Sequence, residues 1–109
     1  MPDYSYRPAA QLRQALLDGA ELALVDLREE AEFARNHPLF AANLPLSKLE
    51  LEIFRRVPRL TTPITVYDNG EGLAELAVER LHSWGYQDVA LLEGGLQGWQ
   101  RKRSAGNSQ

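Results

Sequence analysis

The sequence predicts an α/β fold in which a parallel sheet is covered by helices on both faces. Three short apolar runs have the composition of buried strands, at 22–26, 63–67 and 88–92. Helical patterns lie before and between these runs, at 8–19, 29–36, 47–57 and 73–84. Strands that alternate with helices in this way are typical of folds whose neighbouring strands run parallel.

The first part of the chain is predicted to form a helix, a strand and a second helix. Pro8 suits the first turn of a helix because an amide hydrogen is not needed there, and Gly19 suits its end. The run 22–26 is apolar enough for a buried strand. The segment 29–36 carries acidic residues in its first turn, where they complement the helix dipole. A brief extended piece follows at 43–46.

A longer helix is predicted from the capping-box pattern Ser47-Lys-Leu-Glu50. In this pattern a serine and a glutamate three residues later bond each other's backbone amides. Pro58 ends the helix because it cannot continue the hydrogen-bond ladder. The residues expected on its inner face are Leu49, Ile53 and Val57.

The clearest strand is 63–67, which combines β-branched and aromatic residues and runs into the turn signal Asp68-Asn69-Gly70. The next helix is predicted over 73–84 and ends at Gly85. Its inner face is expected to consist of Ala74, Ala77, Val78 and Leu81. A last strand is predicted at 88–92.

Length and composition indicate a single domain at residues 1–103, with a short final helix at 96–103 and a flexible tail at 104–109. The 109 residues, 44% of them apolar, suffice for one core. No long amphipathic seam is left over, so the domain is expected to be a monomer. The chain is either a whole protein or one domain of a longer protein.

Charge and cysteine content exclude several classes of function. The net charge of -3 and the scattered arginines argue against a nucleic-acid partner. The absence of cysteine excludes disulfides, thiolate metal sites and thiol nucleophiles. No stretch reaches the roughly 20 apolar residues of a membrane span, and the N-terminus lacks a signal pattern, so a cytoplasmic protein without membrane contact is expected. The lone His37 and His82 predict no metal, and no cofactor is expected.

The turn after the 63–67 strand is the candidate site, because ligands of open α/β sheets bind beyond the carboxyl ends of the strands. Asp68 has two interpretations. As a nucleophile it would resemble the aspartate of phosphatases, which need a second acid two residues later, where Gly70 stands. As a structural residue it would cap the next helix or accept hydrogen bonds from loop amides, and this interpretation is favoured.

Two groups of motifs follow one another along the chain. The first consists of Val25-Asp26-Leu27-Arg28-Glu29, Glu32-Phe33, His37 and Ala42-Asn43-Leu44-Pro45. The second consists of Val66-Tyr67, Gly85-Tyr86, Val89, Gly94-Gly95 and Trp99. Their order and spacing resemble a rhodanese-like domain over roughly residues 5–103. The segment 36–42 departs from the family's usual glycine-containing loop.

The resemblance implies a five-stranded, mainly parallel sheet with a site at the end of the fourth strand. Active members hold a cysteine there, whose thiolate carries sulfur as a persulfide from a donor such as thiosulfate to an acceptor such as cyanide. Asp68 falls on that position, and a carboxylate cannot form a persulfide. The implied vestigial loop is Asp68, Asn69, Gly70, Glu71, Gly72, Leu73 and Ala74. The residues implied to be structural are Asp26, Arg28, Gly94, Gly95 and Trp99.

This loop is similar to that of the non-catalytic domain of tandem rhodaneses. The similarity implies a catalytically inactive module of a larger sulfurtransferase, whose partner is another rhodanese domain of the same chain or a separate protein. The face at 68–72 is expected either to contact that partner or to have lost its pocket. The alternative is a phosphatase-like hydrolase that uses Asp68.

Overall fold

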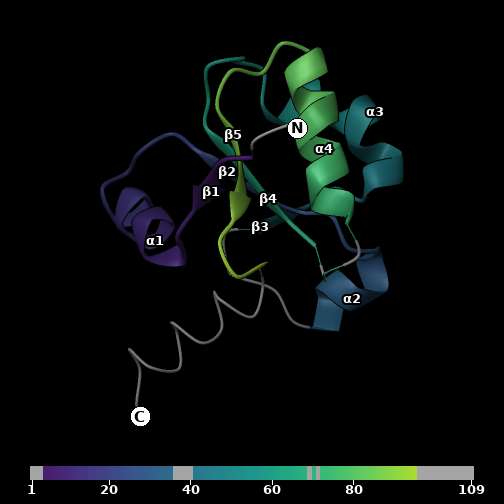
Figure 1. Ribbon diagram of the computed structural model, residues 1–109, viewed down its shortest axis with the longest axis horizontal. Helices are drawn as coiled ribbons and strands as arrows, with labels where there is room; N and C mark the ends of the chain where they lie inside the picture. Colours follow the sequence, from purple (N-terminus) through teal and green to yellow (C-terminus); the bar gives the residue numbers. More distant parts are fainter. Residues whose placement is uncertain (1–3, 36–40, 69, 71, 96–109) are drawn as a thin grey trace.

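The computed structural model describes residues 4–35, 41–68, 70 and 72–95 of the chain (Figure 1). In these residues five strands form one sheet in the order β1-β5-β4-β2-β3. The strands are β1 (Tyr6–Arg7), β2 (Ala23–Asp26), β3 (Ala41–Asn43), β4 (Ile64–Tyr67) and β5 (Val89–Leu92). All neighbouring strands are parallel, which confirms the predicted α/β class.

Helices cover both faces of the sheet, as predicted. Those of the described residues are α1 (Ala9–Leu17), α2 (Glu30–Arg35), α3 (Leu46–Arg56) and α4 (Leu73–Ser83). Figure 1 shows α1 on one face, whereas α3 and α4 lie side by side on the other. The helix expected at 96–103 and the tail at 104–109 lie outside the described residues.

The central strands contribute to two apolar cores, because successive side chains of a strand point to opposite faces. Ile64 and Val66 of β4 belong to the core under α3 and α4, whereas Tyr67 belongs to the core under α1. All four residues of β4 are buried. This burial is expected for a parallel strand that is covered on both faces.

The inner faces of α3 and α4 are the predicted ones. Their buried residues, together with the residue that follows α3, are Leu49, Ile53, Val57, Ala74, Ala77, Val78 and Leu81. Full burial of an aliphatic side chain contributes roughly 1.5–3 kcal/mol. These contacts therefore hold both helices on the sheet.

The capping-box prediction for α3 is wrong. The helix begins at Leu46, directly after Pro45, and no side chain caps it, so Ser47 lies within its first turn. The Pro45 carbonyl accepts a hydrogen bond from the Lys48 amide at 2.8 Å, and Leu46 packs against the core. Because the helix starts one residue before Ser47, Leu46 packs against the core. This apolar contact, rather than a serine cap, stabilises the start of α3.

The sequence patterns also do not reveal β1. Its two residues are too few to show a periodicity, and the strand exists because it pairs with β5. Arg7 strengthens this position by donating a hydrogen bond to Oγ1 of Thr65 at 2.7 Å and another to Asp88. Long-range pairing, rather than local propensity, therefore forms β1.

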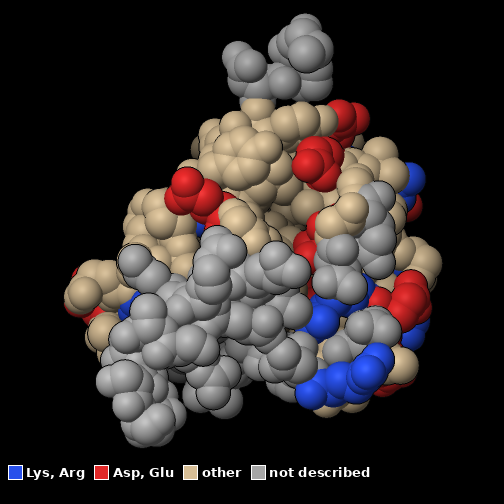
Figure 2. Space-filling model, turned by 60° about the horizontal axis from the view of Figure 1, so that its bottom comes forward, with Lys and Arg blue, Asp and Glu red and all other residues tan. Residues whose placement is uncertain are grey.

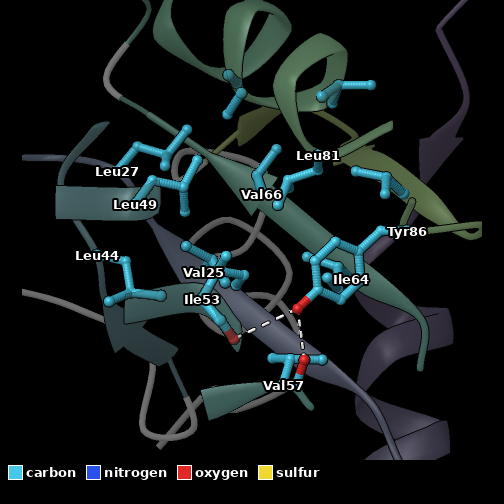
Figure 3. Close-up of a cluster of buried hydrophobic side chains, with 14 of the residues drawn as sticks. Val25, Leu27, Leu44, Leu49, Ile53, Val57, Ile64, Val66, Leu81 and Tyr86 are labelled. Carbon is cyan, nitrogen blue, oxygen red and sulfur yellow. Dashed lines mark hydrogen bonds between the residues drawn. The ribbon is translucent and has the colours of Figure 1, made fainter. Parts of the chain in front are cut away.

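Tyr86 fastens the end of α3 to the turn that leads into β5 (Figure 3). Its hydroxyl donates a hydrogen bond to the carbonyl oxygen of Val57 and lies 3.4 Å from that of Ile53. The Val57 carbonyl lies just past the end of α3, where helix carbonyls have no amide of a following turn to bond. The Ile53 carbonyl also accepts a hydrogen bond from the Val57 amide at 2.7 Å. Burial raises the pKa of Tyr86, so the hydroxyl keeps its proton at neutral pH.

Tyr86→Phe is expected to lower the free energy of unfolding by about 1 kcal/mol, because the Val57 carbonyl loses its donor while the ring is retained. Urea unfolding followed by circular dichroism measures the difference. Tyr6→Phe is the matched control, since Tyr6 is 59% exposed, and its effect should stay within about 0.5 kcal/mol. Equal losses in the two variants would contradict the role of Tyr86.

Candidate functional site

A hollow of about 340 Å³ lies beyond the carboxyl ends of β1, β5 and β4, where the sequence places the candidate site. Strand ends, the loop after β4, the first turn of α4 and two glycines after β5 line it. Parallel strands deliver these segments to one edge of the sheet, as in other open α/β folds. Of the two outcomes expected for this face, the hollow argues against loss of the pocket, and contact with a partner stays a prediction.

Asp68 turns its carboxylate back onto the loop that follows it. Oδ1 accepts a hydrogen bond from the Gly70 amide at 2.9 Å. Oδ2 accepts hydrogen bonds from the amides of Leu73 at 2.6 Å and Ala74 at 3.0 Å. The last two amides belong to the first turn of α4 and have no acceptor within the helix. These contacts confirm the structural role expected of Asp68, which caps α4 and binds loop amides.

Two glycines allow the loop to fold back in this way. Gly70 has a φ of 87° and Gly72 a φ of 86°. These values lie in the left-handed region, which glycine adopts at no steric cost. Gly72 occupies the N-cap of α4 and has no side chain to bond the helix amides. The carboxylate of Asp68 takes over this role from four residues earlier in the chain.

Among the described residues, those that line the hollow and carry charge are Asp68 and Glu75, and both are acidic. Figure 2 shows acidic side chains around a recess on this side of the molecule. One loop amide and two amides of the first turn of α4 are already bonded to the carboxylate of Asp68. Free amides at a helix N-terminus would attract an anion. Here an anion would meet negative charge instead.

A second carboxylate lies buried at the carboxyl end of β2. Asp26 is 0% exposed and is paired with Arg28, which is 5% exposed. The guanidinium of Arg28 approaches Oδ1 at 3.0 Å from Nε and Oδ2 at 2.8 Å from a terminal nitrogen, and the Arg28 amide donates to Oδ1 at 2.8 Å. Tyr67 donates its hydroxyl to Oδ2. One carboxylate therefore joins the ends of β2 and β4.

Tyr67 and Asn43 complete this network, and neither has a sequence signal for that role. The side-chain amide of Asn43 donates to the carbonyl oxygens of Asp26 at 3.2 Å and Arg28 at 2.8 Å. Asp26 is the register partner of both Asn43 in β3 and Tyr67 in β4. Only knowledge of this strand pairing would have identified them.

The side chains of this network keep one protonation state at neutral pH. Burial, followed by the hydrogen bond to Asp26, raises the pKa of Tyr67 far above its usual value. The hydrogen bond to Asp26 is also the main cause that raises the pKa of Arg28. At neutral pH Tyr67 is thus a neutral donor and Arg28 is charged, and both serve the buried carboxylate.

Of the other residues named from the sequence, some lie in the described part of the chain and some lie outside it. Gly94 and Gly95 follow β5 and line the hollow, with φ values of 75° and 59°. The residues outside the described part of the chain are His37, Asn69, Glu71 and Trp99. His82 lies exposed in the last turn of α4. Among the described residues, no group of three or more His, Cys, Asp or Glu is placed to hold a metal ion.

The described helices are too short or too polar to cross a membrane.

The chain is similar to several known proteins, and the three described here are longer than it. Thiosulfate sulfurtransferase from Pseudomonas aeruginosa is 64% identical with a TM-score of 0.88, over 90% of this chain and 19% of that chain. The Alr3790 protein from Anabaena sp. is 26% identical with a TM-score of 0.77, over 88% of this chain and 76% of that chain. An uncharacterized protein of Synechocystis sp. is 32% identical over 93 residues, which are 85% of this chain and 51% of that protein.

A family model for the rhodanese-like domain matches residues 8–102. The matched range contains α1 to α4, the strands β2 to β5 and the loop that holds Asp68. The sheet also has the number of strands that the sequence resemblance implies. The chain therefore belongs to the family of rhodanese-like domains.

Proposed function

We propose that this chain is a rhodanese-like domain that does not transfer sulfur itself and serves a larger sulfurtransferase as a structural or binding module. The main support for this proposal is the set of hydrogen bonds that the Asp68 carboxylate accepts. This residue follows β4 directly, at the position that resembles the cysteine of active members. Its Oδ1 accepts a hydrogen bond from the loop and its Oδ2 accepts two from the first turn of α4. A carboxylate has no sulfur with which to form a persulfide, and the chain contains no cysteine.

The charge of the hollow supports the same proposal. A sulfane donor such as thiosulfate is an anion, and active members stabilise anionic sulfur with loop amides and the helix N-terminus. In this chain the carboxylate of Asp68 accepts hydrogen bonds from three such amides. Glu75 adds a second negative charge to the lining. The hollow is therefore poorly suited to a sulfane donor.

The length of the relatives supports a role within a larger protein. This chain spans about half of its curated relative from Synechocystis sp., 51%. It spans 19% of the Pseudomonas protein, whose name records thiosulfate sulfurtransferase activity. Such relatives have further polypeptide in which a cysteine-bearing domain can lie. A partner domain in the same protein and a location in the cytoplasm remain predictions.

The hydrolase alternative gains no support from the bonding of Asp68. A nucleophilic carboxylate needs an oxygen with a free lone pair directed at the substrate. Oδ2 of Asp68 accepts two hydrogen bonds from α4 and Oδ1 accepts one from the loop, so protein amides occupy both lone pairs of Oδ2 and one of the two of Oδ1. These bonds stabilise the negative charge and lower its reactivity.

The purified chain is expected to form thiocyanate from thiosulfate and cyanide at the rate of buffer alone, because no thiol is present to carry the sulfur. A colorimetric thiocyanate assay measures this. A rhodanese-like domain with a loop cysteine, assayed in parallel, is the positive control. Turnover above the buffer rate by homogeneous protein would disprove the proposed inactivity.

Asp68→Ala is expected to lower the free energy of unfolding by about 1 kcal/mol, because α4 loses its cap. Asp68→Asn is the matched control and should lose less, since its amide oxygen can still accept hydrogen bonds from Leu73 and Ala74. Chemical unfolding of the three proteins gives the comparison. Unchanged or increased stability of Asp68→Ala would contradict a capping role and would favour a residue kept for chemistry.

Asp68→Cys alone is expected not to yield a competent sulfurtransferase. A free thiol titrates near pH 8.5, so only a few per cent is thiolate at neutral pH, and the charge of Glu75 further disfavours an anion in the hollow. Adding Glu75→Gln should raise kcat/KM for thiosulfate several-fold, where each tenfold corresponds to about 1.4 kcal/mol. Equal activity of the single and double variants would show that charge in the hollow is not limiting.

A further inference from the structure

Apolar side chains gather on the surface at the end of the domain opposite the hollow. Helices α3 and α4 run back from the carboxyl ends of the strands, so their C-terminal ends lie at the amino ends of β4 and β5. We call the residues gathered there the aromatic patch; they are Leu51, Phe54, Leu60 and Trp84. The exposed fractions are 79% for Leu51, 45% for Phe54 and 38% for Leu60, and Trp84 is partly buried.

The members of the aromatic patch are connected to one another. The ring of Phe54 lies 6.3 Å from the ring of Trp84, measured between centroids, and is stacked on Tyr86 at 5.5 Å. Leu51 precedes Phe54 by three residues and is its neighbour on the surface of α3. Leu60 lies against Gly85, where an added Cβ would be 3.2 Å from its Cδ1. Gly85 separates Trp84 from Tyr86 in the chain, so Leu60 lies beside the same turn.

Buried residues beneath the aromatic patch hold its side chains in place. Tyr86 stacks on Phe54, and its hydroxyl is bonded to the Val57 carbonyl. Ile53, next to Phe54, is 0% exposed and anchors the same turn of α3 in the core. A surface that is ordered before binding loses little conformational entropy when a partner docks. Rigid aromatic anchors of this kind are enriched among residues that dominate binding energy.

Arginines lie next to members of the aromatic patch along α3, the turn after it and α4. Arg55 and Arg56 lie in the last turn of α3, Arg59 follows it, and Arg80 lies one turn before Trp84. Arg55 is paired with Glu52 at 3.7 Å and Arg59 with Glu21 at 3.1 Å, and both arginine side chains are more than 70% exposed, at 77% and 73%. Exposed pairs of this kind contribute little and exchange readily. These cations therefore remain available to a partner, although the whole chain has a net charge of -3.

Isolated exposed leucines are ordinary on protein surfaces, and Leu17 on α1, 81% exposed, is one of them. The aromatic patch differs because its apolar residues lie beside one another and arginines lie next to them. An apolar centre with a charged rim is the anatomy of a protein interface. The sign of the rim indicates a partner of negative charge.

We propose that the aromatic patch docks an acidic protein surface with an apolar centre, presented by another domain of a longer polypeptide. The inference rests on the proposed function, because it gives the binding module a contact surface. Relatives have room for such a domain, since this chain matches only 19% of the Pseudomonas protein and 51% of the Synechocystis protein. The contact lies away from Asp68 and leaves the hollow open.

Photo-crosslinking in the cell of origin tests the surface. A benzophenone amino acid is introduced into the protein at Leu51, at the equally exposed Leu17 as matched control, or at Glu75 on the hollow. The Leu51 probe is expected to give a discrete product, at least about tenfold more abundant than that from the Leu17 probe; a tenfold difference in occupancy corresponds to about 1.4 kcal/mol. Mass spectrometry of the crosslinked peptide should identify an acid-rich segment of a different domain.

Variants that reverse the charge of the arginines distinguish specific docking at the aromatic patch from chance contact. Arg55→Glu with Arg59→Glu should reduce the Leu51 product about tenfold, as loss of interface charge does, whereas Arg55→Lys with Arg59→Lys should retain it. Urea unfolding of both variants confirms that they fold. Insensitivity to charge reversal, a product with a second copy of this chain, or a basic crosslinked segment would each overturn the proposal.

The position of the product also separates this inference from the proposed function. A product from Glu75 without one from Leu51 overturns the aromatic patch as the docking surface but keeps the domain a binding module. No product from any of the three positions overturns both.

Discussion

At the carboxyl end of the sheet, the buried carboxylate of Asp26 accepts hydrogen bonds from the side chains of Arg28 and Tyr67. A charge with no exposure to water is stable only when its lone pairs are bonded, and removing one member of such a pair costs roughly 3–5 kcal/mol. Strands β2 and β4 must therefore end at the same level. The backbone at the rim of the hollow depends on this one contact.

The loop that defines the site begins where that network ends. Tyr67 is held by Asp26, and Asp68 is the next residue, so the direction in which β4 leaves the sheet is set by the buried pair. Asp68 then binds the first amides of α4. A chain of three acidic or aromatic side chains thus runs from the centre of the sheet to the helix that follows it. In this arrangement Asp68 is part of the framework, at the position that the sequence resemblance assigns to the cysteine of active members.

The two ends of the domain have opposite character. The carboxyl end of the sheet has a hollow with an acidic lining, whereas the amino end has exposed apolar side chains bordered by arginines. The proposed loss of sulfur transfer and the proposed docking surface are compatible, because they concern different ends of the same fold and share no residue.

The sequence by itself determined the class of fold, the helix faces and the position of the site. The faces of α3 and α4 follow from local periodicity, and the site follows from the end of the strand at 63–67. The bonding of Asp68 was also within reach, because its partners lie two, five and six residues away in the chain. Strand β1, the start of α3 at Leu46 and the roles of Tyr67 and Asn43 depended on the tertiary structure. They arise from strand pairing and core contacts between residues far apart in the sequence, and local patterns contain no information about such pairings.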